Sequence, residues 1–357
     1  MSIKEHINKI RELSSEIGRP VKLMEVCGTH TVAAFRSGLR SILPENLSLL
    51  SGPGCPVCVT PNDYLDRAIA VAMQTDSTVA TFGDMLRVPG TESSLELARA
   101  QGADIQVVYS PLEALKSAQG NPERKVVFLG VGFETTTPAI AWTIKDAFEK
   151  GIKNYYVLSA HKTVPPAMAA LIQGEIKVDG FICPGHVSVI IGAEAYDFIS
   201  RDFHIPCVVT GFEPLDMVTG IEMLLQQMAD ERAAVEIQYS RSVNREGNLE
   251  AQAVIREVFE ECDTEWRGVG VIPRSGLAIR EKYVSHDAAG IYKDLELPAP
   301  AENPGCICGE ILKGLKLPYD CKLFEKVCNP SSPVGACMVS SEGTCAAYFK
   351  YAKRNQK

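Results

Sequence analysis

The densest group of potential metal ligands in this chain is a set of six cysteines near its C-terminal end. Four thiolates suit a [4Fe–4S] cluster or a zinc ion, although the spacings fit neither a two-hairpin zinc ribbon nor the bacterial ferredoxin run. Buried free thiols are the remaining interpretation. We expect an iron–sulfur cluster, and the two thiols beyond four ligands suit a redox pair. The six are Cys306, Cys308, Cys321, Cys328, Cys337 and Cys345.

A second cysteine pair, Cys55 and Cys58, lies in the run GPGCPVC just before a helix start at Thr60-Pro61. The amides and the dipole of a following helix favour the thiolate form. Two cysteines cannot complete a tetrahedral zinc site alone. We therefore expect a redox pair, with half a zinc site and a purely structural turn as alternatives.

A third site combines a thiol with an imidazole. Cys27 ends a buried apolar run, and Gly28, Thr29 and His30 follow it. A lone cysteine at a strand end is often simply part of the core. A thiolate three residues before an imidazole nevertheless suits a soft or borderline metal such as iron.

Several polar residues are expected at strand ends in the middle of the chain. Helix capping and hydrogen bonding are the alternative to a site there. Gly130-Val131-Gly132 lacks the third glycine of a dinucleotide fingerprint. Phosphate-loop and Cys-x-x-x-Cys-x-x-Cys motifs are absent from the sequence, and the other three cysteines look like buried thiols. The polar residues are Glu134, Thr135, Thr136, His161, His186 and Ser188.

Short apolar runs alternate with helical stretches, which predicts parallel sheets covered by helices. The expected strands are Val21–Cys27, Leu47–Ser51, Thr78–Phe82, Ile105–Tyr109, Lys125–Val131, Tyr155–Ser159, Gly180–Cys183 and Cys207–Thr210. Similar turn chemistry suggests four strands repeated once. The motifs quoted above fall at strand carboxyl ends, where such sheets bind ligands.

We therefore predict an α/β protein with two similar parallel-sheet domains facing a cleft, at residues 1–119 and 120–232. A C-terminal cysteine-rich iron–sulfur domain is expected at residues 233–357. That unit would start with a strand at Val235–Tyr239 and a helix around Leu249–Cys262. The spacing of isoleucines from Ile3 to Ile17 predicts an amphipathic first helix.

Composition restricts the class of protein. The chain is 46% hydrophobic with a net charge of −8, which favours folded domains and argues against nucleic-acid binding. We see neither an export signal nor an uncharged membrane span. A cytoplasmic location keeps thiols reduced, so twelve cysteines indicate metal or redox chemistry rather than disulfides.

Taken together, these motifs resemble the HypD family of hydrogenase maturation proteins over nearly the whole chain. The resemblance rests on MEVCGTH at Met24–His30, GPGCPVC at Gly52–Cys58, GFETT at Gly132–Thr136, PGHVS at Pro184–Ser188 and the six-cysteine tail. It implies a role in building the active site of nickel–iron hydrogenase. The family carries a [4Fe–4S] cluster. With a HypC-type chaperone it forms a scaffold for an iron atom bearing two cyanides and one carbon monoxide, Fe(CN)2CO.

The resemblance further implies that cyanide arrives from HypE, loaded by HypF, and that the finished unit reaches the hydrogenase large subunit. Cys27 would be an iron ligand, shared with a cysteine of HypC, and His30 would lie beside it. Cys55 and Cys58 would be the redox pair of the cleft. Glu134 would position the incoming group or a proton donor.

The tail also resembles the cluster arrangement of ferredoxin–thioredoxin reductases. That likeness assigns Cys306, Cys321, Cys328 and Cys345 to the cluster, and Cys308 with Cys337 to an adjacent pair. The electrons would reduce a thiocyanate to release cyanide onto iron. An iron–sulfur disulfide reductase and a zinc-stabilised binding module are the competing hypotheses.

Overall fold

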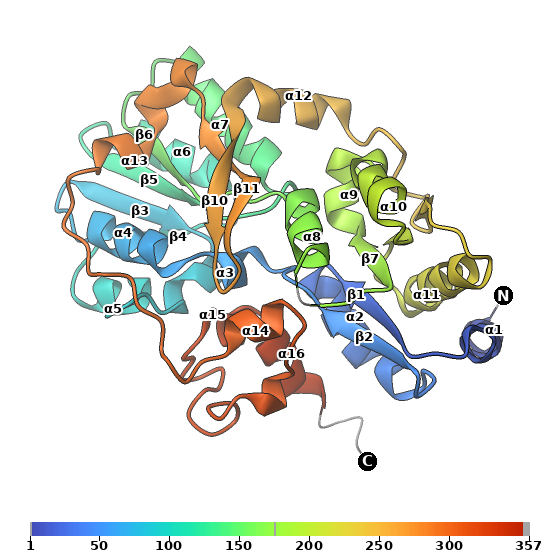
Figure 1. Cartoon of the computed structure of the whole chain (residues 1–357). Helices are drawn as coiled ribbons and strands as arrows, with labels where there is room; N and C mark the ends of the chain where they lie inside the picture. Colours follow the sequence, from blue (N-terminus) through green and yellow to red (C-terminus); the bar gives the residue numbers. More distant parts are fainter. Residues whose placement is uncertain (1, 175, 353–357) are drawn as a thin grey trace.

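The computed structural model describes residues 2–174 and 176–352. Its strands form two parallel sheets and an antiparallel hairpin (Figure 1). Sheet A has the order β2 (Leu47–Ser51), β1 (Val21–Glu25), β7 (Gly180–Pro184), β8 (Cys207–Thr210), β9 (Val235–Ile237). Sheet B has the order β4 (Ile105–Val107), β3 (Ser77–Thr81), β5 (Lys125–Gly130), β6 (Tyr155–Ser159). The hairpin pairs β10 (Phe259–Trp266) with β11 (Gly270–Ile279).

Helices cover the sheets and fill the space around their strand ends (Figure 1). The α-helices are α1 (Ile3–Ile17), α2 (Gly28–Arg36), α3 (Pro56–Val59), α4 (Asn62–Ala72), α5 (Leu95–Ala100), α6 (Pro111–Gly120), α7 (Thr137–Glu149), α8 (Val164–Ile172), α9 (Gly185–Ile191), α10 (Asp197–Phe203), α11 (Pro214–Ala229), α12 (Leu249–Val258), α13 (Ala288–Ile291), α14 (Cys308–Leu312), α15 (Ala336–Val339) and α16 (Thr344–Tyr351). The 3-10 helices are η1 (Leu39–Ser41), η2 (Gly83–Arg87), η3 (Glu194–Tyr196), η4 (Glu281–His286) and η5 (Pro318–Asp320).

All eight expected strands are present. Their central members are buried on both faces, as in β3 and β7, where every residue is buried. This explains why they appear in the sequence as continuous apolar runs rather than alternating ones. The first helix also matches its expected bounds, because a Ser2 capping box starts it and Gly18 ends it with a φ of 64°.

The prediction that each sheet comes from one continuous stretch of chain, divided between residues 119 and 120, is wrong. β1 pairs with β7, so sheet A takes strands from both expected domains. β3 pairs with β5, and sheet B is mixed in the same way. The chain crosses from sheet A to sheet B after β2 and returns to sheet A after β6. Parallel neighbouring strands are joined by crossover connections, so they need not be adjacent in the sequence.

The expected repeat of four strands is nevertheless visible in the strand order. Sheet A contains the second and first strands of the first set, followed by the third and fourth strands of the second set. Sheet B, read from β6 to β4, contains the second and first strands of the second set, followed by the third and fourth strands of the first set. Each sheet therefore joins the first half of one repeat to the second half of the other.

The segment that follows residue 233 is distributed over both sheets. β9 is a strand of sheet A. The helix expected to reach Cys262 ends at Val258, and Phe259–Trp266 becomes a strand because it pairs with Gly270–Ile279. α12 packs against both α7 and α9, and η4 and α13 pack against β6.

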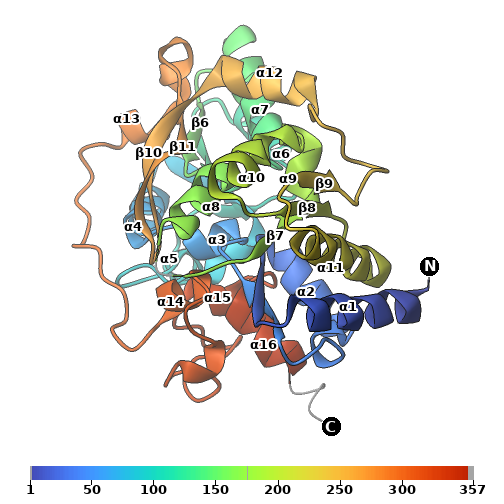
Figure 2. The ribbon, with the colours of Figure 1, turned by 45° about the vertical axis from the view of Figure 1, so that its right-hand side comes forward.

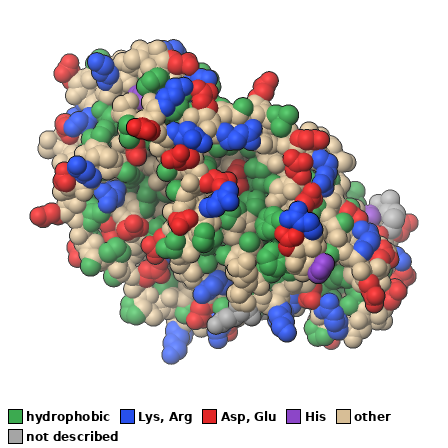
Figure 3. Space-filling view, turned by 45° about the horizontal axis from the view of Figure 1, so that its top comes forward, with side chains coloured by type: hydrophobic (Ala, Val, Ile, Leu, Met, Phe, Trp, Pro, Cys, Tyr) green, Lys and Arg blue, Asp and Glu red, His purple; other side chains and the backbone are tan. Residues whose placement is uncertain are grey.

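The cysteine-rich tail carries α14, α15 and α16 and lies beneath both sheets (Figures 1 and 2). Residues 353–357 of the expected C-terminal unit lie outside the described residues. Acidic and basic side chains are interspersed on the face shown in Figure 3. Within residues 2–174 and 176–352, a helix long and apolar enough to cross a membrane is not found.

Candidate metal and redox site

The Cys27 turn lies at a place where ligands bind open parallel sheets. β1 leads to β2 on one side and β7 leads to β8 on the other, so the strand order reverses between β1 and β7. Cys27 is the N-cap residue of α2, just beyond β1. The buried Glu25 supports this turn by accepting hydrogen bonds from Thr31 Oγ1 at 2.8 Å and Arg40 at 2.6 Å.

Cys27 and His30 are both buried, with opposite consequences for their protons. Burial, with the nearby Glu342 carboxylate, raises the pKa of Cys27 to about 11, so this cysteine is a neutral thiol until a metal displaces the proton. Burial lowers the pKa of His30 to about 4, so the imidazole is neutral. A neutral imidazole is the form that binds metals.

The orientation of His30 is fixed by sheet A. Its Nε2 lies 3.1 Å from the carbonyl oxygens of both Thr210 and Gly211. Carbonyls only accept, so Nε2 carries the proton and Nδ1 keeps a free lone pair. Nδ1 is buried without a hydrogen-bond partner among the described residues. This unpartnered nitrogen is the atom that could bind iron.

Phe212 separates two histidines at the same strand ends. Its ring stacks on His30 at 4.6 Å and on His186 at 4.0 Å between centroids. His186 follows β7, as the sequence predicts for a polar residue at a strand end. Phe212 was missed, although its place directly after β8 is the same kind of position.

Cys55 and Cys58 form a disulfide directly beside the Cys27 turn. Gly28 N donates to Gly54 O at 3.1 Å. A Cβ added to Gly54 would lie 2.4 Å from the backbone of Cys27. Only a glycine permits this approach, so the two motifs that the sequence singled out share one backbone contact.

A tail loop, Ser340–Gly343, joins the strand ends of both sheets. Thr29 Oγ1 donates to Glu342 Oε1 at 2.7 Å, beyond sheet A. Ser340 Oγ donates to Asp84 Oδ2 at 3.1 Å, beyond sheet B. Sequence reasoning missed Glu342, because a single exposed-looking glutamate carries no spacing signal.

The tail cysteines lie close to the disulfide and to one another. Cys58 Sγ is 4.0 Å from Ala336 O, next to Cys337. The Sγ atoms of Cys306 and Cys308 are 3.2 Å apart. The hydrogen bond with Cys306 is the main cause that raises the pKa of Cys308, and the hydrogen bond with Cys308 is the main cause that raises the pKa of Cys345. The hydrogen bond with Cys308 lowers the pKa of Cys337, but the bond with Cys345 and burial raise that pKa above its usual value.

The remaining two tail thiols border the same short segments. Cys321 Sγ is 3.8 Å from Gly305 O, and Cys328 Sγ accepts from Val334 N at 3.4 Å. A Cβ on Gly335 would touch the sulfurs of both Cys306 and Cys308. Six thiols around one region fit the donor set of an iron–sulfur cluster. Among the described residues, three or more such ligands are not arranged around a single ion.

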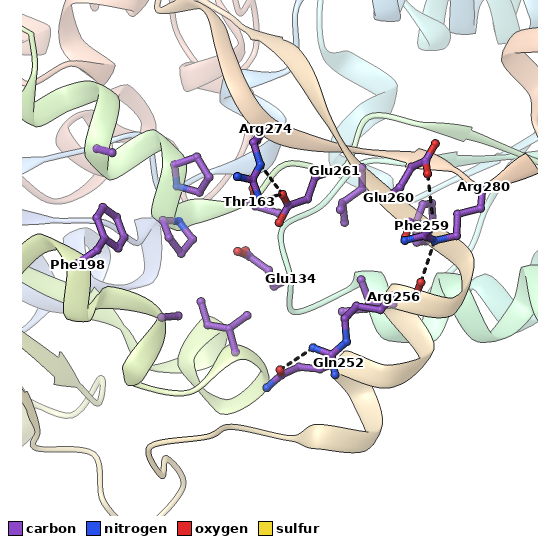
Figure 4. Close-up of a pocket in the computed structure, with 17 residues that line it drawn as sticks. Glu134, Thr163, Phe198, Gln252, Arg256, Phe259, Glu260, Glu261, Arg274 and Arg280 are labelled. Carbon is purple, nitrogen blue, oxygen red and sulfur yellow. Dashed lines mark hydrogen bonds and ion pairs between the residues drawn. The ribbon is translucent and has the colours of Figure 1, made fainter.

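Glu134 does not join the thiol sites. It lies beyond β5 in a separate groove of about 830 Å³, whose lining residues include no cysteine (Figure 4). The carboxyl is buried, and Oε1 accepts from Val164 N at 2.9 Å while Oε2 has no partner in the described part of the chain. Burial raises the pKa of Glu134 to about 7.

Comparison with known proteins shows which family this chain resembles over its whole length. A family model named HypD and described as the "Hydrogenase formation hypA family" matches residues 1–352. The hydrogenase maturation factor HypD of Escherichia coli is 46% identical over all of this chain and 96% of its own length. HypD of Azotobacter vinelandii is 47% identical over 95% of this chain and 91% of its own length. HypD of Cupriavidus necator is 46% identical over 94% and 91%.

Proposed function

The chain belongs to the HypD family and so has a role in hydrogenase maturation; from that premise we propose that it is the cytoplasmic scaffold and redox protein on which the Fe(CN)2CO unit of nickel–iron hydrogenase is assembled. In this proposal a HypC-type chaperone shares the iron with it. A HypE-type partner, loaded by a HypF-type protein, delivers cyanide, and the large subunit receives the product.

The convergence of three cysteine groups is the observation that carries this proposal. Cys27 touches Gly54, the Cys55–Cys58 disulfide approaches α15, and the tail loop binds Thr29. The turn that carries Cys27, the Cys55–Cys58 disulfide and the segments that carry the tail thiols thus lie next to one another. Iron assembly that consumes electrons needs these three parts side by side.

Iron is the cargo of this site. Cys27 would bind it as a thiolate after losing its proton, and the free Nδ1 of His30 lies on the same turn. A soft thiolate and a borderline imidazole suit iron. The remaining positions are left to the chaperone's cysteine and to the incoming cyanide and carbon monoxide.

The cleft pair would supply the electrons that release cyanide. With Cys55 and Cys58 as thiols, a partner thiocyanate R–S–C≡N yields R–SH, cyanide as HCN and the Cys55–Cys58 disulfide. The S–CN bond breaks, an S–S bond forms, and the two thiol protons leave on R–SH and HCN. Reduction of this disulfide by the Cys308–Cys337 pair, which becomes a disulfide in turn, restores the thiols.

The tail would hold a [4Fe–4S] cluster through Cys306, Cys321, Cys328 and Cys345. When bound, such a cluster supplies single electrons to the neighbouring pair. Cys308 contacts Cys306 and Cys345 as well as Cys337, so the choice of Cys308 and Cys337 as that pair rests on the likeness to ferredoxin–thioredoxin reductases. Glu134 faces a different groove, so we leave it out of the thiol chemistry.

A second function, a disulfide reductase that passes cluster electrons to a protein thiol, is favoured by the approach of Cys58 to α15. The two functions differ in their need for Cys27. A reductase uses the tail and the Cys55–Cys58 pair, whereas the assembly scaffold also requires an iron ligand.

Replacing Cys27 with alanine tests the proposal. We expect hydrogenase activity in cell extracts to fall to background, while the purified variant keeps its iron and its visible absorbance in the tail. Cys262→Ala, a cysteine outside all three groups, is the matched control and should mature hydrogenase normally. Full maturation with Cys27→Ala would refute the iron-ligand role and leave the reductase.

A further inference from the structure

Side chains from several helices and from the β10–β11 hairpin line the groove that contains Glu134 (Figure 4). α8 supplies Pro165, Pro166 and Ala169, and α10 supplies Phe198. α12 and the β10–β11 hairpin complete it on the other side. Its volume of about 830 Å³ is within the range that holds small molecules.

Two buried polar atoms in this groove have no hydrogen-bond partner among the residues that the structure describes. Glu134 is 4% exposed, and its Oε2 makes no hydrogen bond within residues 2–174 and 176–352. Thr163 Oγ1 is buried and unpartnered as well. Both residues line the groove. Buried acceptors without donors destabilise a protein, so this floor is shaped for a group that donates hydrogen bonds.

Among the described residues, the arginines at the mouth of the groove are paired with carboxylates, except for Arg256. Arg274 pairs with Glu261 at 2.6 Å, and Arg280 pairs with Glu260 at 3.3 Å. The guanidinium of Arg256 donates only to the neutral Gln252, at 3.1 Å, and has no carboxylate partner among the described residues. One carboxyl on the floor and one guanidinium at the mouth therefore remain unmatched.

In the repeat of four strands, the groove lies at the strand ends equivalent to those of the cysteine site. Glu134 follows β5 and Thr163 follows β6, the first and second strands of the second set. Cys27 and the Cys55–Cys58 pair follow the first and second strands of the first set. The same two strand ends thus carry thiols in one sheet and oxygen ligands in the other.

We propose that this groove binds a basic amino acid. Its guanidinium or ammonium head would donate to Glu134 and Thr163, and its aliphatic stem would lie along Pro165, Pro166 and Ala169. Its carboxylate would meet Arg256. A free amino acid and a basic residue within a partner protein share this head, and they differ in whether the carboxylate is present. The site is separate from the iron-assembly function and does not rest on it.

Calorimetric titration of the full-length protein with three probes tests the proposal. They are L-arginine, N-acetyl-L-arginine amide, which lacks the carboxylate, and L-citrulline, which replaces the guanidinium with a neutral urea. We expect L-citrulline to bind at least about 10-fold more weakly than L-arginine, because a charged donor forms the stronger hydrogen bond to a carboxylate. Equal binding of the two, or no binding of any probe into the millimolar range, overturns the proposal.

The amide separates the two sources of the ligand. If L-arginine binds at least about 10-fold more tightly than the amide, the ligand is the free amino acid, held also by Arg256. If the amide binds as well as L-arginine, the ligand is a residue of a protein chain. Either result supports a basic head on Glu134, and Arg256→Gln should weaken L-arginine only in the first case.

Two matched variants test whether the charged head of the ligand binds Glu134. Glu134→Gln keeps the size of the side chain and the acceptor for Val164 N but removes the charge, and we expect about a 10-fold loss of affinity for L-arginine. Glu260→Gln removes a charge from the same groove that Arg280 already neutralises, and should change the affinity less than about 2-fold. Equal losses in both variants would mean a general charge attraction and would overturn the proposal. Thermal melting checks that each variant is folded.

Discussion

Cys27 and His30 would meet a metal in different protonation states. The pKa of Cys27, raised to about 11 by burial, means that a metal bound there would have to displace a proton from this thiol. The pKa of His30, lowered to about 4, means that the imidazole has no proton to lose at Nδ1. The backbone carbonyls of Thr210 and Gly211 hold that tautomer. The histidine is thus prepared for a metal before it arrives, and the cysteine is not.

Glu134 should make the stability of the fold depend on pH. Burial raises its pKa from 4.5 to about 7 in the folded state. Its contribution is therefore fully present below pH 4.5 and is lost as the pH rises through about 7. We expect the free energy of unfolding of Glu134→Gln, relative to the natural protein, to rise by about 3 kcal/mol over this interval. Urea unfolding at several pH values measures it.

Glu96→Gln is the control for this titration, because Glu96 is exposed in the first turn of α5. It should leave the pH dependence of the unfolding free energy unchanged. Parallel curves for Glu134→Gln and the natural protein would show that Glu134 titrates normally and that its carboxyl group is in contact with water.

The thiol motifs could be predicted from the sequence because metal and redox chemistry need few residue types at short spacing. The partners of those motifs could not. Phe212 and Glu342 reach the Cys27 turn only through the folded chain, from strand ends and loops far away in sequence. Glu134 was found as a polar residue at a strand end, but its distance from the thiols follows from which sheet β5 joins.

At the scale of elements, Gly28 sets how closely the tail loop approaches α2. A Cβ at this position would lie 2.2 Å from the carbonyl oxygen of Glu342. We expect Gly28→Ala to push the tail loop away from the Cys27 turn and to cost about 1–3 kcal/mol of stability. Chemical unfolding measures the loss of stability, and hydrogenase activity in extracts measures the loss of maturation.

Gly120→Ala is the matched control, since an added Cβ at the end of α6 meets nothing within 4 Å. It should be neutral or stabilise the protein by up to about 1 kcal/mol. If Gly28→Ala is as mild as Gly120→Ala, the tail loop is free to move and does not fix the Cys27 turn.

The helices and strands themselves were largely predictable from the sequence, but the pairing of the strands within the sheets was not. Apolar runs bounded by turns gave β2, β6 and β8 with their observed bounds. The end of α12 was missed because Ile255, Phe259 and Cys262 continue a helical spacing, and only pairing with β11 makes Phe259–Trp266 a strand. Strands that are buried on both faces lack an alternating pattern of apolar and polar residues, so their sequence does not indicate which sheet they join.

At the scale of the whole molecule, the exchange of repeat halves ties the two sheets together. Sheet A cannot form without β1 and β7, which lie on opposite sides of the expected boundary. We therefore expect fragments 1–119 and 120–357 to be unfolded when expressed separately, and to form a folded complex when expressed together. Circular dichroism and co-purification through a tag on one fragment measure this.

Two sequential domains would give the opposite result, with each fragment folded alone and no need for the other. A fragment ending after β6, at residue 162, is the control. It contains all four strands of sheet B but only β1 and β2 of sheet A. It should show more secondary structure than fragment 1–119 does.

The tail loop has a consequence for the timing of biosynthesis. Ser340–Gly343 follow every strand of both sheets in the sequence, and they bind the turn that carries Cys27. A ribosome therefore releases the two sheets before it releases the loop that contacts the Cys27 turn, since synthesis proceeds from the N-terminus. If iron is assembled at Cys27 as proposed, this order of residues would restrict iron loading to chains that have been translated past the tail loop.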